Sequence, residues 1–199
     1  MKLDMKTRPI IKMSRYAFMF ILISMSLIGC SEQSNVLAPD NNSNTSEPNW
    51  ITLPQPTGMQ VNKTVSTSKR IVGKYGGTIN LNTSYTGGLY GNVTITSSLY
   101  FPQYAFSYYK TFTISHDDAA CVSTFGPSMV FNKPLTLNIT YTGVDLSGIN
   151  PETVKFAYLA VDGSVEYAPN SGIIVDKSTG TLRVINAVIP HFSRYGFMN

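Results

Sequence analysis

Leu135-Thr136-Leu137-Asn138-Ile139-Thr140-Tyr141 alternates strictly between apolar and polar side chains. Successive side chains of a β-strand point to opposite faces, so this period of two predicts a strand with one buried and one exposed face. No segment of the chain shows a sustained helical period with capping residues. The same alternation predicts further strands within residues 59–65, 78–81, 93–96, 110–114, 154–161, 164–167, 173–175 and 181–184.

Glycine, asparagine and aspartate residues separate these runs at short spacing. Asp162-Gly163 predicts a two-residue hairpin turn between 154–161 and 164–167. Residues 176–180 are predicted to join 173–175 to 181–184 as a further hairpin. Many short strands with such turns predict a sandwich or a closed barrel. Pro102 and Pro134 interrupt the pattern and suit sheet edges, which favours an all-β, antiparallel β-sandwich.

The first 29 residues have the pattern of a secretory leader. Five Lys and Arg residues within 1–15 precede an apolar run over 16–29, which is shorter than the roughly twenty residues that a membrane-spanning helix needs. The stretch Leu27-Ile28-Gly29-Cys30 closely resembles the bacterial lipobox. This resemblance implies removal of residues 1–29, lipidation (palmitate among the acyl chains) of Cys30, and anchoring in the cell envelope. An ordinary secretory leader with an incidental cysteine is the alternative.

The residue after the cysteine, Ser31, implies an outer-membrane location under the sorting rule of enterobacteria. Residues 30–56 are dominated by Ser, Asn, Thr and Pro and are predicted to form a flexible tether. Residues 57–199 then form one domain, large enough for a hydrophobic core. Trp50 either lies within the tether or is the first residue to dock on that domain.

The positive charge of the sequence is concentrated in the leader. The leader contains five of the fifteen Lys and Arg and one of the eleven Asp and Glu, so the remaining chain carries ten of each. The basic pI is therefore no sign of nucleic-acid binding, and no nucleic-acid partner is expected. With Cys30 lipidated, Cys121 has no partner for a disulfide and is predicted to be a small buried residue.

Several short motifs follow one another in an order that resembles a known family. They are Gly76-Gly77-Thr78-Ile79, Val93-Thr94-Ile95, the aromatic run 101–106, Phe125-Gly126-Pro127 with residues 131–137, and the ending His191-Phe192-Ser193-Arg194-Tyr195. Together, over roughly residues 71–197, they resemble the ZU-five domain, a β-sandwich shared by zonula occludens proteins, netrin receptors and ankyrins. The resemblance implies a role in protein contacts.

The C-terminal triplet carries a further implication of that resemblance. In some ZU-five domains His-Phe-Ser is a self-cleavage site, and on this chain the hydroxyl of Ser193 would attack the carbonyl of Phe192 with His191 as general base. The reaction needs strain at the Phe192-Ser193 peptide. The alternative is structural: Phe192 with Tyr195 or Phe197 fills the core, while His191 and Ser193 form local hydrogen bonds.

Other groupings are less specific. His116-Asp117-Asp118 suggests either a metal site or, by preference, a solvated turn. The aromatic residues of 100–109 are expected to be mainly core or edge packing, with a sugar or protein surface as the alternative. The chain has no phosphate-binding glycine loop, nucleophile elbow or helical zinc motif, and no cofactor is expected.

These observations predict a lipid-anchored envelope β-sandwich with a structural, adhesive or protein-binding role. Its expected partners are the membrane, through the lipid on Cys30, and an envelope or extracellular protein or glycan. A domain that cleaves its own Phe192-Ser193 bond is the alternative from another class, and a carbohydrate-binding module is the third.

Overall fold

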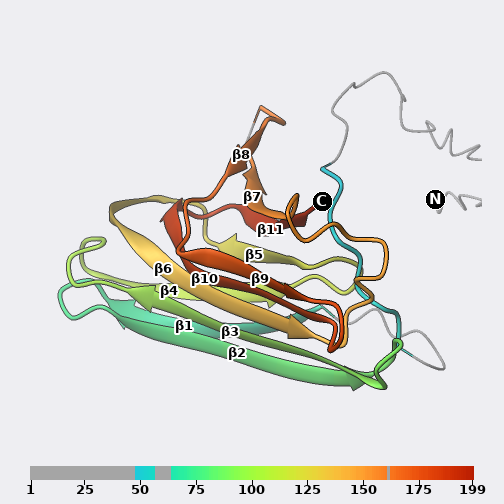
Figure 1. Ribbon diagram of the computed structural model, residues 1–199. Helices are drawn as coiled ribbons and strands as arrows, with labels where there is room; N and C mark the ends of the chain where they lie inside the picture. Colours follow the sequence, from blue (N-terminus) through green and yellow to red (C-terminus); the bar gives the residue numbers. More distant parts are fainter. Residues whose placement is uncertain (1–47, 57–63, 161) are drawn as a thin grey trace, which may run out of the picture. The chain divides into compact units, whose positions relative to one another are not determined.

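A computed structural model describes residues 48–56, 64–160 and 162–199 of the chain (Figure 1). Within these ranges the chain forms strands, and no helix there is long and apolar enough to cross a membrane. The strands are β1 (Val65–Val72), β2 (Gly77–Thr86), β3 (Asn92–Phe101), β4 (Tyr109–His116), β5 (Val122–Gly126), β6 (Val130–Thr142), β7 (Lys155–Leu159), β8 (Val165–Tyr167), β9 (Gly172–Asp176), β10 (Thr181–His191) and β11 (Arg194–Met198).

The strands form two antiparallel sheets that share one hydrophobic core. The strand orders are β1-β4-β5-β11-β7-β8 and β2-β3-β6-β10-β9, and buried side chains of both sheets belong to the same cluster. The predicted all-β sandwich is therefore confirmed. The expected strand pairing of both hairpins is confirmed, because β7 pairs with β8 and β9 pairs with β10. The turn at Asp162-Gly163 is longer than the predicted two residues, since the Ala160 amide donates to the Ser164 carbonyl. The strand expected in 59–65 falls mostly outside the described residues.

The stretch Leu135 to Tyr141 lies in β6, the central strand of the five-stranded sheet, between β3 and β10. Its leucines, isoleucine and tyrosine are buried, whereas the threonines and asparagine between them remain partly exposed. Burying one such aliphatic side chain contributes about 1.5–3 kcal/mol. The alternation therefore determines which face of β6 meets the opposite sheet.

Six phenylalanines fill one end of the core. Phe101 at the end of β3 stacks on Phe112 of β4 with ring centroids 4.8 Å apart, and Phe106 meets Phe112 edge to face at 4.9 Å. Aromatic pairs of this kind contribute about 0.5–1.5 kcal/mol beyond their area burial. The full set, called the phenylalanine cluster below, is Phe101, Phe106, Phe112, Phe125, Phe131 and Phe192. It lies beneath the loop that connects β3 to β4.

Residues 48–56 pack against the sandwich, so the predicted domain start at residue 57 is wrong. Ile51 and Leu53 are buried in the main core, and Trp50 packs with Ala120 and Val122. The amide of Ile51 donates to the Phe197 carbonyl at 2.9 Å, and that of Cys121 donates to the Ile51 carbonyl at 2.7 Å. Of the two readings for Trp50, docking on the domain is confirmed. Residues 48–56 are called the N-terminal strap below.

Candidate functional site

The predicted self-cleavage triplet forms the connection between the two sheets at the C-terminus. His191 ends β10 in one sheet, Ser193 precedes β11 in the other, and Phe192 lies between them. The Phe192 side chain is buried in the phenylalanine cluster, with its ring centroid 4.9 Å from that of Phe131 and 5.4 Å from that of Phe112. Tyr195 and Phe197 are fully buried as well. The predicted packing role of the three aromatic residues is confirmed.

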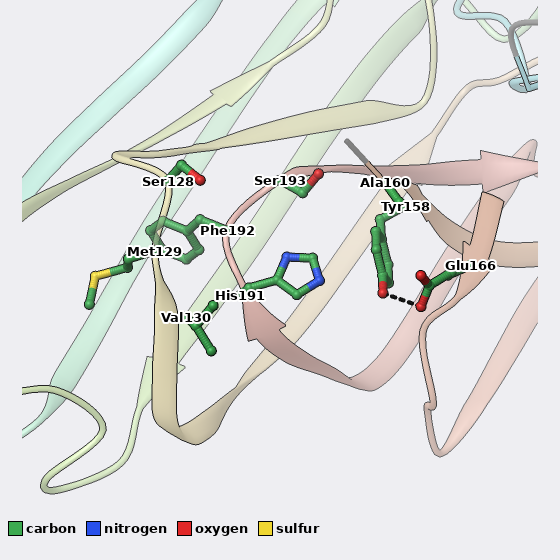
Figure 2. A pocket seen from close by; sticks show the side chains of 9 residues that line it. All are labelled: Ser128, Met129, Val130, Tyr158, Ala160, Glu166, His191, Phe192 and Ser193. Carbon is green, nitrogen blue, oxygen red and sulfur yellow. Dashed lines mark hydrogen bonds between the residues drawn. The ribbon is translucent and has the colours of Figure 1, made fainter. Parts of the chain in front are cut away.

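The side chains of His191 and Ser193 line one cavity, which Figure 2 shows from close by. The Ser193 hydroxyl donates to the Leu159 carbonyl at 3.0 Å. The ring of His191 meets the ring of Tyr158 edge to face, with centroids 4.6 Å apart. No hydrogen bond among the described residues joins the His191 ring to Ser193, so the serine proton is directed at a carbonyl and away from the proposed base.

The backbone at the triplet is anchored on both sides. The Phe192 amide donates to the Met129 carbonyl at 2.9 Å, and the Ser193 carbonyl accepts from the Phe125 amide at 3.1 Å. Within the described chain, the non-glycine residues with left-handed φ are Tyr104, Tyr108 and Asn186, all outside the triplet. The strain that attack on a peptide bond requires is therefore not present in the φ angles of this connection.

The cavity beside the triplet has apolar and polar walls, and encloses about 280 Å³. Met129, Val130 and Phe192 form the apolar side, while Tyr158, Glu166 and His191 form the polar side (Figure 2). The hydrogen bond from the Tyr158 hydroxyl to the Glu166 carboxylate raises the pKa of Tyr158 to about 12. Tyr158 therefore stays protonated at neutral pH and donates to Glu166.

The second histidine lies inside the core. His116 ends β4 and is only 1% exposed, so the preferred interpretation of His116-Asp117-Asp118 as a solvated turn is wrong for the histidine. Both ring nitrogens face serine hydroxyls: Nε2 lies 3.1 Å from Ser97 Oγ, and Nδ1 lies 2.7 Å from Ser123 Oγ. The imidazole thus has no free nitrogen to coordinate a metal ion.

One tautomer of His116 satisfies the whole buried network. The Ser97 hydroxyl donates to the Leu81 carbonyl, so Ser97 Oγ accepts from Nε2–H, and Nδ1 accepts from the Ser123 hydroxyl. Tyr141 then donates its hydroxyl to Ser123 Oγ. A serine paired with a histidine has the form of an activated nucleophile, but both side chains are buried. Burial lowers the pKa of His116 to about 4, and the network is structural.

The carboxylates after His116 have partners of their own. Asp117 Oδ1 accepts from the amides of Ala119 and Ala120, and its Oδ2 lies 3.4 Å from Arg194 Nη2. The described residues contain no group of three or more His, Cys, Asp and Glu side chains placed to hold a metal ion. Cys121 is fully buried, as predicted, and burial raises the pKa of its thiol.

Four tyrosines project into solvent at one end of the sandwich. Tyr75 lies in the β1–β2 turn, Tyr104 and Tyr108 in the β3–β4 loop, and Tyr109 begins β4. Tyr108 is 87% exposed and Tyr75 is 67% exposed. The phenylalanines of the same aromatic run, Phe101 and Phe106, are buried. The expectation of mainly core or edge packing for the aromatic run 100–109 is therefore correct for the phenylalanines, whereas Tyr104, Tyr108 and Tyr109 of that run lie in solvent. The end of the molecule that carries these three tyrosines and Tyr75 is called the tyrosine end below.

The loops of the tyrosine end are held together by backbone contacts. The Tyr104 amide donates to the Gly73 carbonyl, and the Gly73 amide donates to the Tyr108 carbonyl, each at 2.7 Å. A Cβ atom on Gly73 would lie 2.0 Å from the Phe106 carbonyl oxygen, so only glycine allows this approach. Tyr104 and Tyr108 have φ angles of 64° and 63°, in the left-handed region that side chains disfavour. The sequence carried no pattern for this conformation.

Comparisons with known proteins add no assignment. No protein-family model matches the sequence, and neither curated proteins nor solved structures show a significant similarity to it. The fold therefore rests on the structure, and the resemblance to the ZU-five domain stays a prediction. The lipobox residues 27–30 lie outside the described residues.

Proposed function

We propose that this chain is a lipid-anchored β-sandwich of the cell envelope that binds another envelope or extracellular macromolecule through its tyrosine end. The proposal rests on the positions of the N-terminal strap and of the tyrosine end on the sandwich. The N-terminal strap pairs Thr52 with Ala120, shortly after His116 at the end of β4. Tyr109, at the opposite end of the same strand, belongs to the tyrosine end. The strap and the tyrosine end therefore lie at opposite ends of the sandwich.

The separation follows from the strand itself. A strand of eight residues, as in β4, spans on the order of 25 Å at about 3.3 Å per residue. The strap also meets Gly87, just past the end of β2, while the start of β2 adjoins the β1–β2 turn with Tyr75. The polypeptide therefore enters the sandwich at the strap, and the tyrosines lie at the other end. Exposed, rigidly held aromatic side chains are typical of binding surfaces.

Anchoring is tested by labelling cells that produce the full chain with radioactive palmitate. We expect label in the wild-type chain, and none in a Cys30→Ser variant, which changes one atom of the predicted lipid site. Fractionation of the membranes then tests the predicted outer-membrane location. Equal labelling of both chains, or none in either, would contradict the lipidated anchor.

Binding through the tyrosine end is tested in the envelope by photo-crosslinking. A benzoylphenylalanine replaces Tyr104 in one chain and Tyr167 of β8, an equally accessible tyrosine outside the tyrosine end, in the control chain. We expect light-dependent adducts from position 104 and not from position 167. Adducts at both positions or at neither would contradict a binding role of this end.

Self-processing at Phe192-Ser193 is the second candidate, and the shared cavity of His191 and Ser193 is the observation in its favour. Intact mass of the mature chain under denaturing conditions tests it beside a Ser193→Ala variant. A chain that ends at Phe192, with a released heptapeptide that the substitution abolishes, would support cleavage. We expect a single full-length mass in both samples, because the Ser193 hydroxyl donates to Leu159 and lacks a bond to His191.

A further inference from the structure

The charges of the described chain are unevenly distributed along the sequence, although the predicted mature chain is neutral overall. Residues 64–116 contain four Lys and Arg and no Asp or Glu, and every carboxylate side chain of the described residues lies at or after Asp117. Asp117 and Asp118 follow β4, Asp145 follows β6 and Asp176 ends β9, all at the end that holds the strap. Glu152 precedes β7, and Asp162 and Glu166 belong to the β7–β8 hairpin, where Glu166 lines the cavity beside Val130 and His191. None of these carboxylates lies on the β1–β2 turn or the β3–β4 loop. The tyrosine end is therefore locally cationic.

The cations of the tyrosine end lie against its rings. The guanidinium carbon of Arg70 is 3.8 Å from the ring centroid of Tyr109. Lys133 Nζ is 5.7 Å from the ring centroid of Tyr104, and Lys74 Nζ is 5.6 Å from that of Tyr75. These are cation–π distances. The ion pair that the described residues form joins Arg194 to Asp117, near the strap. Arg70, Lys74 and Lys133 therefore keep their N–H donors for a ligand.

We propose that the tyrosine end binds an acidic polysaccharide, with uronic-acid carboxylates held by Arg70, Lys74 and Lys133 and sugar rings packed on the tyrosine faces. This inference rests on the proposed function and names the class of partner. A sugar ring has an apolar face and polar edges, which match the face and hydroxyl of tyrosine. Arginine donates two parallel hydrogen bonds to a carboxylate, and the adjacent ring fixes the plane of its guanidinium.

An anionic lipid membrane and single-stranded nucleic acid are two other partners with related chemistry, and both fit this surface less well. Proteins that insert into bilayers use Trp, Phe and Leu, whereas the phenylalanines of this end are buried and its exposed rings carry hydroxyls. The surface also lies at the end of the sandwich opposite the N-terminal strap. Single-stranded nucleic acid also stacks on aromatic rings beside cations, but it is not an expected polymer of the envelope.

The loop conformation supports a preformed binding surface. Tyr104 and Tyr108 of the β3–β4 loop keep their left-handed backbone because the loop is hydrogen-bonded to Gly73 and packs on the phenylalanine cluster. A rigid aromatic surface loses little conformational entropy when it binds a polymer. The tyrosine side chain has few rotatable bonds, so four rings give a large contact area at a small entropic cost.

The experiment is titration calorimetry with the mature chain carrying Cys30→Ser, which removes only the predicted lipid. The probes are polygalacturonate and its fully methyl-esterified form, which has the same sugar ring without the carboxylate charge. We expect polygalacturonate to bind at least about tenfold more tightly than the ester, and its affinity to fall as salt is raised from 0.05 to 0.5 M. Equal binding of the two polymers, or binding of neither, would overturn the proposal.

Matched variants locate the site. Arg70→Gln and Tyr108→Ala are each expected to weaken binding by about tenfold, and Tyr108→Phe to retain most of it because the ring remains. Arg183→Gln on β10 and Tyr167→Ala on β8 are the controls, and neither should change affinity. Tyr108 is 87% exposed, so its replacement leaves the fold intact, which a thermal melt verifies. Equal losses in the control variants would overturn the assignment.

Two further probes distinguish the sources of negative charge. Vesicles containing phosphatidylglycerol and a single-stranded DNA oligonucleotide are titrated under the same conditions, and both should bind more weakly than polygalacturonate. Preferential binding of either probe would overturn the sugar assignment. If photo-crosslinks form at position 104 while polygalacturonate does not bind, the partner class is wrong and the binding function stands. If neither occurs, both proposals fail.

Discussion

Replacing Tyr108 by glycine is expected to stabilise the protein although it removes an aromatic side chain. Tyr108 has a φ of 63°, and a left-handed backbone costs a residue with a Cβ roughly 1–2 kcal/mol. Glycine avoids this cost but loses about 0.5–1 kcal/mol through its greater freedom in the unfolded chain. The ring is 87% exposed, so its removal sacrifices little burial. The net gain is about 0.5–1 kcal/mol.

Urea denaturation of the mature Cys30→Ser chain measures this gain, with Tyr108→Ala as the matched control. Alanine also lacks the ring but keeps the Cβ that causes the strain, so the difference between the two variants isolates the backbone effect. A gain of 1 kcal/mol corresponds to a rise of about 2–4 °C in Tm for a domain of this size. The hydrogen bond from the Gly73 amide to the Tyr108 carbonyl persists in both variants, because it involves only backbone atoms.

The reasoning would be refuted if Tyr108→Gly were no more stable than Tyr108→Ala. A second comparison is Tyr167→Gly in β8, where the backbone is extended. Glycine in a strand destabilises by roughly 0.5–1 kcal/mol, so the same substitution should have the opposite sign there. Combined with the expected loss of polysaccharide binding, a more stable Tyr108→Gly chain would show that the wild-type loop gives up stability for its binding surface.

Three further predictions concern the core. The pKa of His116 is lowered to about 4 from 6.5 by burial, so the neutral imidazole is the form that the folded state favours. Its contribution to stability is complete above about pH 6.5 and is lost as pH falls through 4, a change of about 3 kcal/mol. Urea titrations at a series of pH values should show this loss of stability in the wild type and not in His116→Gln. Gly196→Ala should cost about 1–3 kcal/mol in the same assay, since its Cβ would lie 2.6 Å from Val122 Cγ2; an unchanged midpoint would contradict the close packing under the strap. Phe192→Ala should cost about 3–5 kcal/mol and Phe192→Leu clearly less, and equal losses would show that cavity volume is not the cause.

The fold was predictable because alternation and turn chemistry are local properties. In β6 the side chains that alternate in the sequence also alternate in burial, and the turn at Asp162-Gly163 is flanked by the expected pair of strands. The N-terminal strap was not predictable from the same signal. Trp50-Ile51-Thr52-Leu53 is too short for a period to be recognised, and its burial depends on Phe197 and Cys121, which are distant in sequence.

The surroundings of the candidate site residues were harder to predict, because they come from segments that are distant in the sequence. The sequence marks His116 as a titratable group beside two carboxylates, but the serines that occupy its nitrogens come from β3 and β5. The aromatic run 100–109 gave no sign of which rings would be buried. Strand alternation ends at Phe101, and the left-handed residues Tyr104 and Tyr108 redirect the chain, so a period of two no longer assigns the faces.

The tyrosine end and the phenylalanine cluster are two sides of one short segment of chain. Phe101, Phe106 and Phe112 point inward and stack on one another, and this burial offsets the cost of the two left-handed tyrosines between them. The tyrosines consequently keep their rings in solvent beside cations that no described carboxylate neutralises. A loop under selection for stability alone would place glycine at both positions, because glycine adopts this backbone without strain. The presence of two tyrosines there, over a rigid aromatic base and at the end opposite the strap, is the physical reason to look for a ligand on this surface.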